Sequence, residues 1–265
     1  MKIGIVGCAG RMGRMLINEV LATDGCNLAG GTEREGSDFI GVDLGQLAGA
    51  GETGIACTDD AAALFTIADA IIDFTLPVAT TDHAALALEH GVSLVIGTTG
   101  LNDDQQGALD VAARRTTVVQ AANFSVGVNL LLGLAEQVAG VLDESFDIEI
   151  IEMHHKHKVD APSGTALAIG KAAAAGRGVN LDDVAQRVRD GHTGERRNGD
   201  IGFATLRGGD VAGEHTAVFA GAGERIELTH KAASRVIFAR GAVRAALWAK
   251  NQPPGLYSMK DVLGF

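Results

Sequence analysis

The stretch "KIGIVGCAGRMG", residues 2–13, decides the fold. It starts with a short apolar run typical of a buried strand, and a helical pattern begins after the glycine-rich turn. Its glycines, Gly7, Gly10 and Gly13, follow a relative of the usual G-x-G-x-x-G spacing. In that motif the glycines permit a tight turn and a close approach of backbone to a pyrophosphate, which the helix N-terminus then faces. The stretch predicts a dinucleotide-binding strand, turn and helix, although the same glycines also suit a turn that serves packing alone.

The second expected strand supports the dinucleotide. It ends at Glu33, 20 residues after Gly13, where an acidic residue is expected to hydrogen-bond the adenosine ribose. Arg34 follows directly, and an arginine there can hold a 2′-phosphate or stack on adenine. Because Glu33 favours NADH and Arg34 favours NADPH, we expect either cofactor or both. The alternative is a solvated Glu-Arg-Glu run at the end of a strand.

Apolar strands and alanine-rich helical stretches alternate through the first half of the chain. The strands are expected at 69–75, 92–99 and 116–124, and the helices at 59–68, 79–90 and 103–115. This alternation predicts an α/β fold, a Rossmann-type doubly wound parallel sheet with helices on both faces. Asn102 and Gln105 form a capping pair at one helix start. The glycine-rich segment 36–54 is interpreted as a surface loop.

Ligands of such a sheet bind beyond the carboxyl ends of its strands. Two small-residue segments follow strands there, and small residues leave room for a ring. They are Gly97, Thr98 and Thr99, and Ala121, Ala122, Asn123 and Phe124. We expect both segments to bind the cofactor; the alternative for each is an ordinary tight turn.

The pattern changes near residue 125. Ser125 can cap a long helix, after which residues 146–155 alternate as a half-exposed strand does, and a further helix is expected at 163–175. Beyond a polar loop at 189–200, strands at 201–207, 213–220 and 224–230 are joined by glycine-rich turns and look antiparallel. A last helix, 234–250, is stopped by two prolines.

We therefore expect two domains. Residues 1–125, joined by the segment 235–265, form the dinucleotide-binding domain. Residues 126–234 form a substrate-binding α+β domain with a mixed, largely antiparallel sheet.

Composition excludes several classes of function. The 265 residues carry a net charge of -11, which disfavours nucleic acid and anionic membranes as partners. The 3 cysteines have no CxxC spacing and fit neither a disulfide framework nor a zinc ribbon. The N-terminus does not have the pattern of a signal peptide, and no apolar run reaches the ~20 residues of a membrane span. We expect a cytoplasmic protein.

Positive charge gathers in "EMHHKHKVDAPSGTA", residues 152–166, despite the acidic background. Three interpretations compete: a metal site, a solvated basic face, and a pocket for an anionic substrate. Neighbouring residues of a strand point to opposite faces, so His154 cannot easily join His155 and His157 around one metal, and we expect none. A solvated face suits Lys156 and His157 individually.

An anion pocket accounts for more of the stretch. Ser163 precedes a helical run, so Gly164 and Thr165 would offer backbone N–H groups and a hydroxyl to a carboxylate. His155 and Lys158 add positive charge if the chain bends after His155. A histidine titrates near pH ~6.5, so His154 can donate a proton near neutrality, and Lys158 is the other candidate donor. The combination suits a small dicarboxylic acid.

Five motifs together, "GCAGRMG", "ERE", "GTTG", "AANFS" and "HHKHKVDAPSGTA", resemble those of the dihydrodipicolinate reductase family of bacterial lysine and diaminopimelate biosynthesis. The resemblance covers essentially the whole chain. It implies an oxidoreductase that reduces a cyclic dicarboxylic imine to tetrahydrodipicolinate with NADH or NADPH and without a metal. It also implies a homotetramer, assembled through the sheet of the second domain.

The resemblance implies roles for individual residues. His154 would donate the proton, with Lys158 as a second donor or electrostatic helper. Substrate carboxylates would be held by His155, Gly164 and Thr165, and the cofactor pyrophosphate by Gly7, Cys8, Ala9, Gly10, Arg11 and Met12. Cys8 stands where small apolar residues such as alanine are common. Two alternatives stay open: a nicotinamide dehydrogenase acting on aspartate or homoserine, and a non-catalytic dinucleotide sensor.

Overall fold

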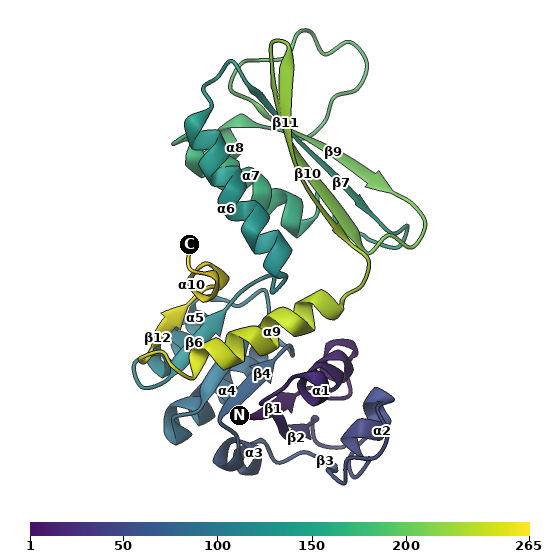
Figure 1. The fold of residues 1–265 in the computed structure, drawn as a ribbon, viewed down its shortest axis with the longest axis vertical. Coiled ribbons are helices and arrows are strands. Elements are labelled where there is room, and N and C mark those ends of the chain that lie inside the picture. Colours follow the sequence, from purple (N-terminus) through teal and green to yellow (C-terminus); the bar gives the residue numbers. More distant parts are fainter. The chain divides into compact units, whose positions relative to one another are not determined.

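The computed structural model describes all residues from Met1 to Phe265 and divides into two compact units (Figure 1). The first unit joins Met1–Val126 to Val236–Phe265, and the second is Gly127–Arg235. These bounds differ by one residue from the expected ones.

A seven-stranded sheet in which every pair of neighbours is parallel forms the centre of the first unit. Its spatial order is β12-β6-β5-β4-β1-β2-β3. The strands are β1 (Lys2–Val6), β2 (Asn27–Thr32), β3 (Cys57–Thr58), β4 (Ala70–Asp73), β5 (Ser93–Ile96), β6 (Thr117–Gln120) and β12 (Gly255–Tyr257). The strand order reverses at β1, so the edge between β1 and β4 is where such folds bind ligands.

Helices cover both faces of this sheet, which confirms the doubly wound fold. One face carries α1 (Arg11–Ala22), α2 (Leu44–Ala48), α9 (Val236–Ala249) and α10 (Met259–Leu263). The other carries α3 (Ala61–Ile67), α4 (Pro77–His90) and α5 (Asp103–Ala112). Because strands between two helical layers have no solvent face, β4 is buried along its whole length. The capping box of Asn102 and Gln105 at the start of α5 is confirmed.

The segment 36–54 is not only a loop, as had been expected. It contains α2, where the Asp43 side chain accepts hydrogen bonds from the N–H groups of Gly45 and Gln46. Leu44 and Leu47 are buried in the core beside α1. The glycines around this helix hid its single apolar turn.

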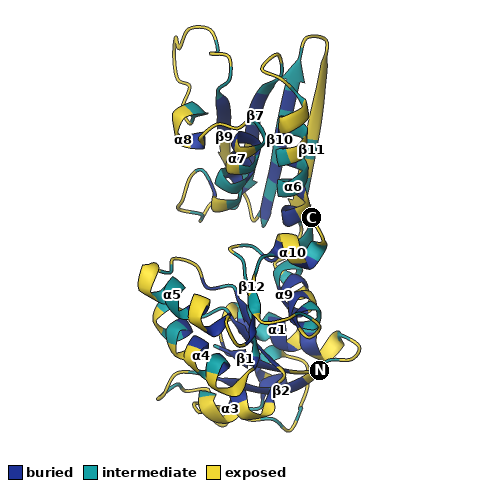
Figure 2. Cartoon of the chain, turned by 90° about the vertical axis from the view of Figure 1, so that its left-hand side faces the viewer, coloured by how far each residue is buried: buried dark blue, intermediate teal, exposed yellow.

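The second unit is a five-stranded mixed sheet with helices on one face. Its order is β11-β10-β7-β9-β8. The strands are β7 (Asp147–His154), β8 (Ala185–Gln186), β9 (Ile201–Arg207), β10 (Gly213–Gly221) and β11 (Glu224–Ala232), and the helices are α6 (Val126–Val141), α7 (Gly164–Gly176) and α8 (Leu181–Val184). Even-numbered residues of β7 are buried on the helical face. Figure 2 shows β11 largely exposed.

One strand pairing differs from the expectation. We expected β9 and β10 to be antiparallel neighbours, but β7 lies between them and runs parallel to β9. The connection from β9 to β10 wraps around the end of β7. Two backbone hydrogen bonds hold it there: the Gly208 N–H donates to the His154 carbonyl at 2.9 Å, and the His155 N–H donates to the Val211 carbonyl at 2.8 Å. Two of the sheet's four pairings are therefore parallel, but the two antiparallel pairings contain most of the paired residues, so the sheet is mixed and largely antiparallel as expected.

None of the helices combines the length and apolar character needed to cross a membrane.

Candidate active site

A cavity of about 620 Å³ lies in the first unit, where the strand order reverses. It brings together predicted residues that are distant in sequence: Gly7, Gly10, Glu33 and Arg34. Its remaining walls include Phe74, Thr75 and His83, which sequence reasoning missed.

The glycine turn has the shape that the motif predicts. Gly7 has a φ of 69°, and a Cβ at Gly13 would come within 2.3 Å of the Gly7 carbonyl oxygen. Only glycine at 13 therefore lets α1 start directly on the turn. Gly10 caps α1 without a side chain, so the first N–H groups of the helix stay uncovered. This cradle fits a pyrophosphate.

Glu33 and Arg34 follow β2 beside this turn. The Glu33 carboxylate accepts a hydrogen bond from the Ala9 N–H at 2.8 Å, which ties the end of β2 to the glycine turn. Arg34 is exposed at the rim of the cavity and makes no ion pair. Of the other turn residues, Cys8 is buried, with its Sγ 3.4 Å from Cys57 Sγ; Ala9 is buried, Arg11 is exposed and Met12 is half-buried.

A buried carboxylate organises the neighbouring strand ends. Asp73, at the end of β4, is inaccessible to solvent and accepts hydrogen bonds from five groups. They are the Thr75 N–H (2.8 Å) and hydroxyl (2.6 Å), the Thr80 and Thr98 hydroxyls (both 3.1 Å) and His83 Nδ1 (2.8 Å). Burial alone would raise the pKa of Asp73, but the His83 contact and the threonine donors outweigh it and lower the pKa. Thr98 is thereby held against β4.

The two predicted segments after β5 and β6 lie at adjacent strand ends, outside the lining of the cavity. Gly97 packs so closely on Phe74 that a Cβ would come within 2.2 Å of its ring. Thr99 is exposed, and Phe124 is buried with its ring centroid 5.5 Å from that of Phe74. Ala121 and Asn123 are half-buried and Ala122 is exposed.

In the second unit, His154 ends β7 as a buried side chain. Its Nδ1 lies 2.6 Å from a carboxylate oxygen of Glu152, which is also buried. Glu152 accepts two further hydrogen bonds from Arg207, at 2.8 and 2.9 Å, and one from the Ser163 N–H at 2.9 Å. Burial would raise the pKa of Glu152, but these donors outweigh it and lower the pKa.

The same network reaches the N-terminus of α7. Ser163 caps this helix, its hydroxyl accepting from the Ala166 N–H at 3.1 Å. Gly164 is exposed and its N–H makes no hydrogen bond, and Thr165 stands next to it, half-buried. His215 Nε2 lies 3.1 Å from the Ser163 hydroxyl. The predicted carboxylate cradle and the predicted proton donor thus share one network.

The loop that follows β7 carries the remaining predicted residues. Lys158 Nζ forms an ion pair with Asp160 at 2.8 Å, and it is near enough to lower the pKa of His154. His155 is half-buried, with its ring centroid 6.2 Å from that of exposed His157. No hydrogen bond joins His155 to the Glu152 network.

Three histidines of this unit have lowered pKa values, of which His154 and His215 are buried and His230 is half-buried. Burial is the largest cause for His154, followed by the opposing effect of Glu152, and for His215 burial lowers the pKa to about 4. The His154 and His215 rings meet edge to face with centroids 5.0 Å apart. Burial lowers the pKa of His230 as well.

A family model described as "Dihydrodipicolinate reductase, N-terminus" matches residues 1–124, and one described as "Dihydrodipicolinate reductase, C-terminus" matches residues 127–263. The chain belongs to the dihydrodipicolinate reductase family. As a member of this reductase family, it is an oxidoreductase.

Individual relatives agree with the family. The chain is 57% identical over 264 residues to the 4-hydroxy-tetrahydrodipicolinate reductase of Parvibaculum lavamentivorans, covering 99% of this chain and 97% of that one. It is 55% identical over 265 residues to the reductase of the same name from Rhizobium meliloti, covering 100% and 97%. A dipicolinate-bound dihydrodipicolinate reductase from Paenisporosarcina sp. TG-14 superposes with a TM-score of 0.77 at 25% identity over 97% of each chain.

The sequence alone did not lead us to the residues that surround His154 in the structure. Glu152 was visible as an acidic residue at an inward position of an alternating strand, which is a costly place for a charge. Arg207, 55 residues further on, gave no such signal, because its position opposite His154 depends on β9 running parallel to β7. His215 also comes from a separate strand.

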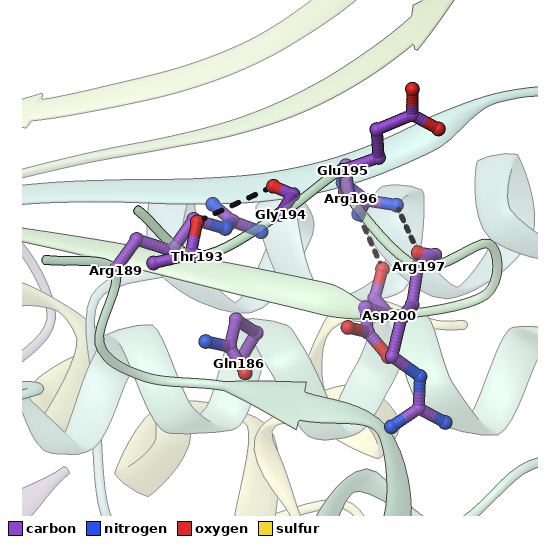
Figure 3. Close-up of a pocket in the computed structure, with 8 residues that line it drawn as sticks. All are labelled: Gln186, Arg189, Thr193, Gly194, Glu195, Arg196, Arg197 and Asp200. Atoms are coloured by element: carbon purple, nitrogen blue, oxygen red, sulfur yellow. Dashed lines mark hydrogen bonds between the residues drawn. The ribbon is translucent and has the colours of Figure 1, made fainter. Parts of the chain in front are cut away.

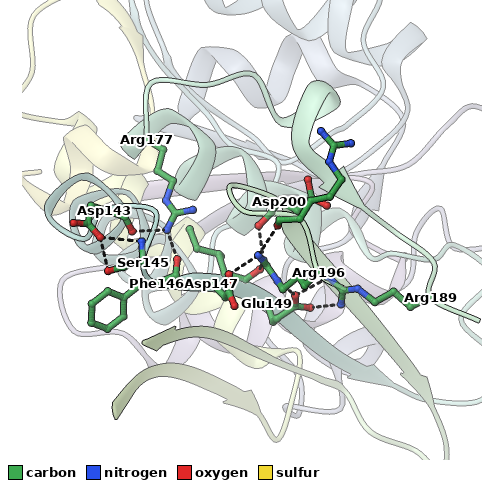
Figure 4. Close-up of polar contacts among 11 residues, drawn as sticks. Asp143, Ser145, Phe146, Asp147, Glu149, Arg177, Arg189, Arg196 and Asp200 are labelled. Carbon is green, nitrogen blue, oxygen red and sulfur yellow. Dashed lines mark hydrogen bonds and ion pairs between the residues drawn. The ribbon is translucent and has the colours of Figure 1, made fainter. Parts of the chain in front are cut away.

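A second charged cluster lies at the opposite end of β7. Arg189 and Arg196 both bind the Glu149 carboxylate, and Arg196 also pairs with Asp147 (Figure 4). Figure 3 shows the adjoining cavity of about 380 Å³, which is lined by residues of the loop before β9 and by Gln186. No group of three or more histidine, cysteine, aspartate or glutamate side chains is arranged to hold a metal ion anywhere in the chain.

Proposed function

We propose that this chain reduces the cyclic imine dicarboxylate derived from 4-hydroxy-tetrahydrodipicolinate to tetrahydrodipicolinate, in lysine and diaminopimelate biosynthesis in the cytoplasm. The observation that carries the proposal is the buried Glu152–His154 pair, hydrogen-bonded to the N-terminus of α7. It places a proton donor beside a helix end that suits a carboxylate. The dipicolinate bound to the relative from Paenisporosarcina is a planar dicarboxylate of the same kind.

The proposed roles follow from the contacts. The open Gly164 N–H, with Thr165, receives one substrate carboxylate, and Lys158 and His155 supply positive charge for the second. When bound, the nicotinamide supplies the hydride to the ring carbon conjugated with the imine. Negative charge then builds at the far end of the conjugated system, where His154 or Lys158 delivers a proton.

The cofactor is NADH, NADPH or both. In the proposed complex the uncovered first turn of α1 and the backbone from Gly7 to Met12 bind the pyrophosphate. The Glu33 carboxylate, already at the edge of the cavity, turns to the ribose, and Arg34 meets a 2′-phosphate. The turns 97–99 and 121–124 lie on the nicotinamide side.

The proposed assembly is a homotetramer through the sheet of the second unit. Ile151 and Leu206 project from the sheet face opposite the helices and are 39% and 50% exposed, so a partner sheet would cover apolar surface there. Sedimentation equilibrium tests this: a monomer at micromolar concentration contradicts it.

The function is tested by following NADH and NADPH consumption separately. The substrate must be generated freshly from pyruvate and aspartate semialdehyde by the preceding synthase. We expect synthase-dependent loss of at least one cofactor, and the two rates give the preference. A folded protein that binds the cofactors yet consumes neither contradicts the proposal.

Binding of pyridine-2,6-dicarboxylate separates the alternatives. A dinucleotide sensor should ignore this planar substrate analogue, and a dehydrogenase of aspartate or homoserine should bind it poorly. Tight binding that depends on cofactor supports the proposed substrate.

A further inference from the structure

A single carboxylate connects two parts of the second unit. The Glu152 side chain is 1% exposed, and its oxygens accept from His154 on the same strand and from the Ser163 N–H that precedes α7. Arg207, on the neighbouring strand, donates to both of its oxygens. A buried carboxylate is retained without this set of donors only at a cost of several kcal/mol.

We propose that Glu152, neutralised by Arg207, is a positioning residue that fixes both the proton donor His154 and the carboxylate-binding start of α7 in one arrangement. The proposal rests on the proposed function, in which His154 delivers the proton. Neither residue needs to touch the substrate: each acts through His154 and Ser163.

The contact with Glu152 decides which nitrogen of His154 is available. Since Nδ1 donates to the carboxylate, the other nitrogen, Nε2, is the one that can carry a proton to a substrate. Gly213 lies against it: a Cβ there would come within 3.0 Å of His154 Nε2. The glycine therefore leaves room beside the nitrogen that would react.

Arg207 also fixes the loop that carries Lys158. It lies opposite His154 in the register of β7 and β9, and its Nη2 donates to the Asp160 carbonyl at 2.7 Å. Asp160 in turn holds Lys158 Nζ at 2.8 Å. Losing the guanidinium would thus release the loop as well as leave Glu152 without its counter-charge.

The charges around His154 predict opposite effects for the two partners. Glu152 favours the imidazolium, whereas Lys158 and Arg207 disfavour it, and His215 stays neutral above its pKa of about 4. Removing the negative charge should make His154 lose its proton at lower pH, and removing Arg207 should make it retain the proton to higher pH. A partner that only supported the fold would not produce shifts of opposite sign.

The test is a titration of the His154 imidazole by NMR in protein labelled with 13C-histidine, assigned by comparison with His154→Gln. We expect the midpoint to fall by about one pH unit in Glu152→Gln and to rise by about one unit in Arg207→Met. Arg207→Lys, which keeps the charge, covers the case in which Arg207→Met does not fold, and its midpoint should move less. Glu149→Gln, the same change at the other end of β7, is the matched control and should leave the midpoint in place.

Two enzymatic readouts complete the test. The alkaline limb of the pH profile of kcat should move with the NMR midpoint, because the protonated histidine is the active form. Glu152→Gln should also weaken the binding of pyridine-2,6-dicarboxylate at least several-fold, since the Ser163 N–H loses its charged acceptor. Unchanged dicarboxylate binding overturns the link to α7.

The titration needs no catalytic activity, so the two proposals can fail separately. Midpoints that move in the same direction, or not at all, overturn the positioning role of Glu152 and Arg207. Midpoints that move as expected while the pH profile stays fixed support the positioning role and overturn His154 as the proton donor.

Discussion

The two ends of strand β7 carry the same kinds of side chain in different surroundings. At its start, Glu149 binds Arg189 and Arg196, and its side chain is 26% exposed. Toward its end, Glu152 binds Arg207 and is 1% exposed. This partly exposed cluster at the start ties the loop that contains Arg189 and Arg196 to β7, and because water screens its charges we expect it to contribute about 0–1 kcal/mol. Removing one member of a buried ion pair leaves the other charge unpaired, at a large cost in free energy. The second cluster therefore holds His154 in a fixed position.

Groups that could bind an anion are occupied to different extents at the two ends of β7. Arg196 is saturated by Glu149 and Asp147, by the Ile148 carbonyl of β7 and by two carbonyl oxygens of its own loop. Near His154, by contrast, Gly164 at the start of α7 is exposed and its N–H makes no hydrogen bond. The Gly164 N–H at the second end is therefore available to an anion.

The largest effect is expected at His154, the proposed proton donor. His154→Gln should lower kcat by about 10²–10⁴-fold, because the proton transfer loses its donor, while pyridine-2,6-dicarboxylate binds nearly as in the wild type. Steady-state kinetics and calorimetry measure the two quantities. Lys158→Met is the companion variant: it should lower kcat, and should weaken binding too if Lys158 holds a carboxylate. Wild-type kcat in both variants would show that the roles are wrongly assigned.

Closing the space beside His154 should have the next largest effect. Gly213→Ala places a Cβ about 3.0 Å from Nε2 and should lower kcat by about 10–100-fold through misplacement of the reacting groups. The NMR midpoint of His154 should stay close to that of the wild type, because its charged neighbours are unchanged. A kcat within twofold of wild type would mean that Nε2 does not face the substrate.

The third effect is on stability. His215 has its pKa lowered by burial to about 4 from an unperturbed 6.5, so its contribution is complete above pH 6.5 and is lost as the pH falls toward 4. The unfolded chain binds the proton first, which costs about 3 kcal/mol over that interval. Urea unfolding of the second unit at pH 7 and pH 4 should show this loss, and His215→Phe should show a smaller one. Equal losses in both proteins would exclude His215 as the source.

The smallest effect is expected at the other end of β7. Glu149→Gln should lower the free energy of unfolding by less than about 1 kcal/mol, as is usual for partly exposed pairs. Thermal unfolding at low and at high salt measures this, and the difference from wild type should shrink as salt screens the charges. A loss that salt does not reduce would mean that Glu149 is held as tightly as Glu152.

Local patterns predicted the fold well where a feature depends on nearby residues. The turn from Gly7 to Gly13, the cap at Asn102 and the start of α7 at Ser163 each rest on contacts within a few residues. The place of β9 could not be predicted in this way, because a short connection suits a hairpin as well as a crossing around the end of β7. The residues 208–211 settle it through backbone bonds to His154, His155 and Lys156.

The residues of the candidate site also differ in whether local sequence could predict them. His154, Gly164 and Thr165 come from one contiguous motif, so the sequence alone brings them near each other. Arg207 and His215 reach the site from two other strands, and Asp73 acts on a turn 25 residues away through Thr98. Such partners depend on strand order and register, which no local pattern contains.

The most direct test compares kcat in Glu152→Gln and Glu149→Gln, the same substitution three residues apart on one strand. Both variants are assayed with the preferred cofactor and freshly generated substrate, at the pH optimum of the wild type. We predict that kcat falls by about 10–100-fold in Glu152→Gln, as is typical when a functional histidine loses the residue that orients it. In Glu149→Gln we predict a change in kcat within about twofold. Equal values for the two variants would contradict the claim that the buried end of β7 performs the chemistry.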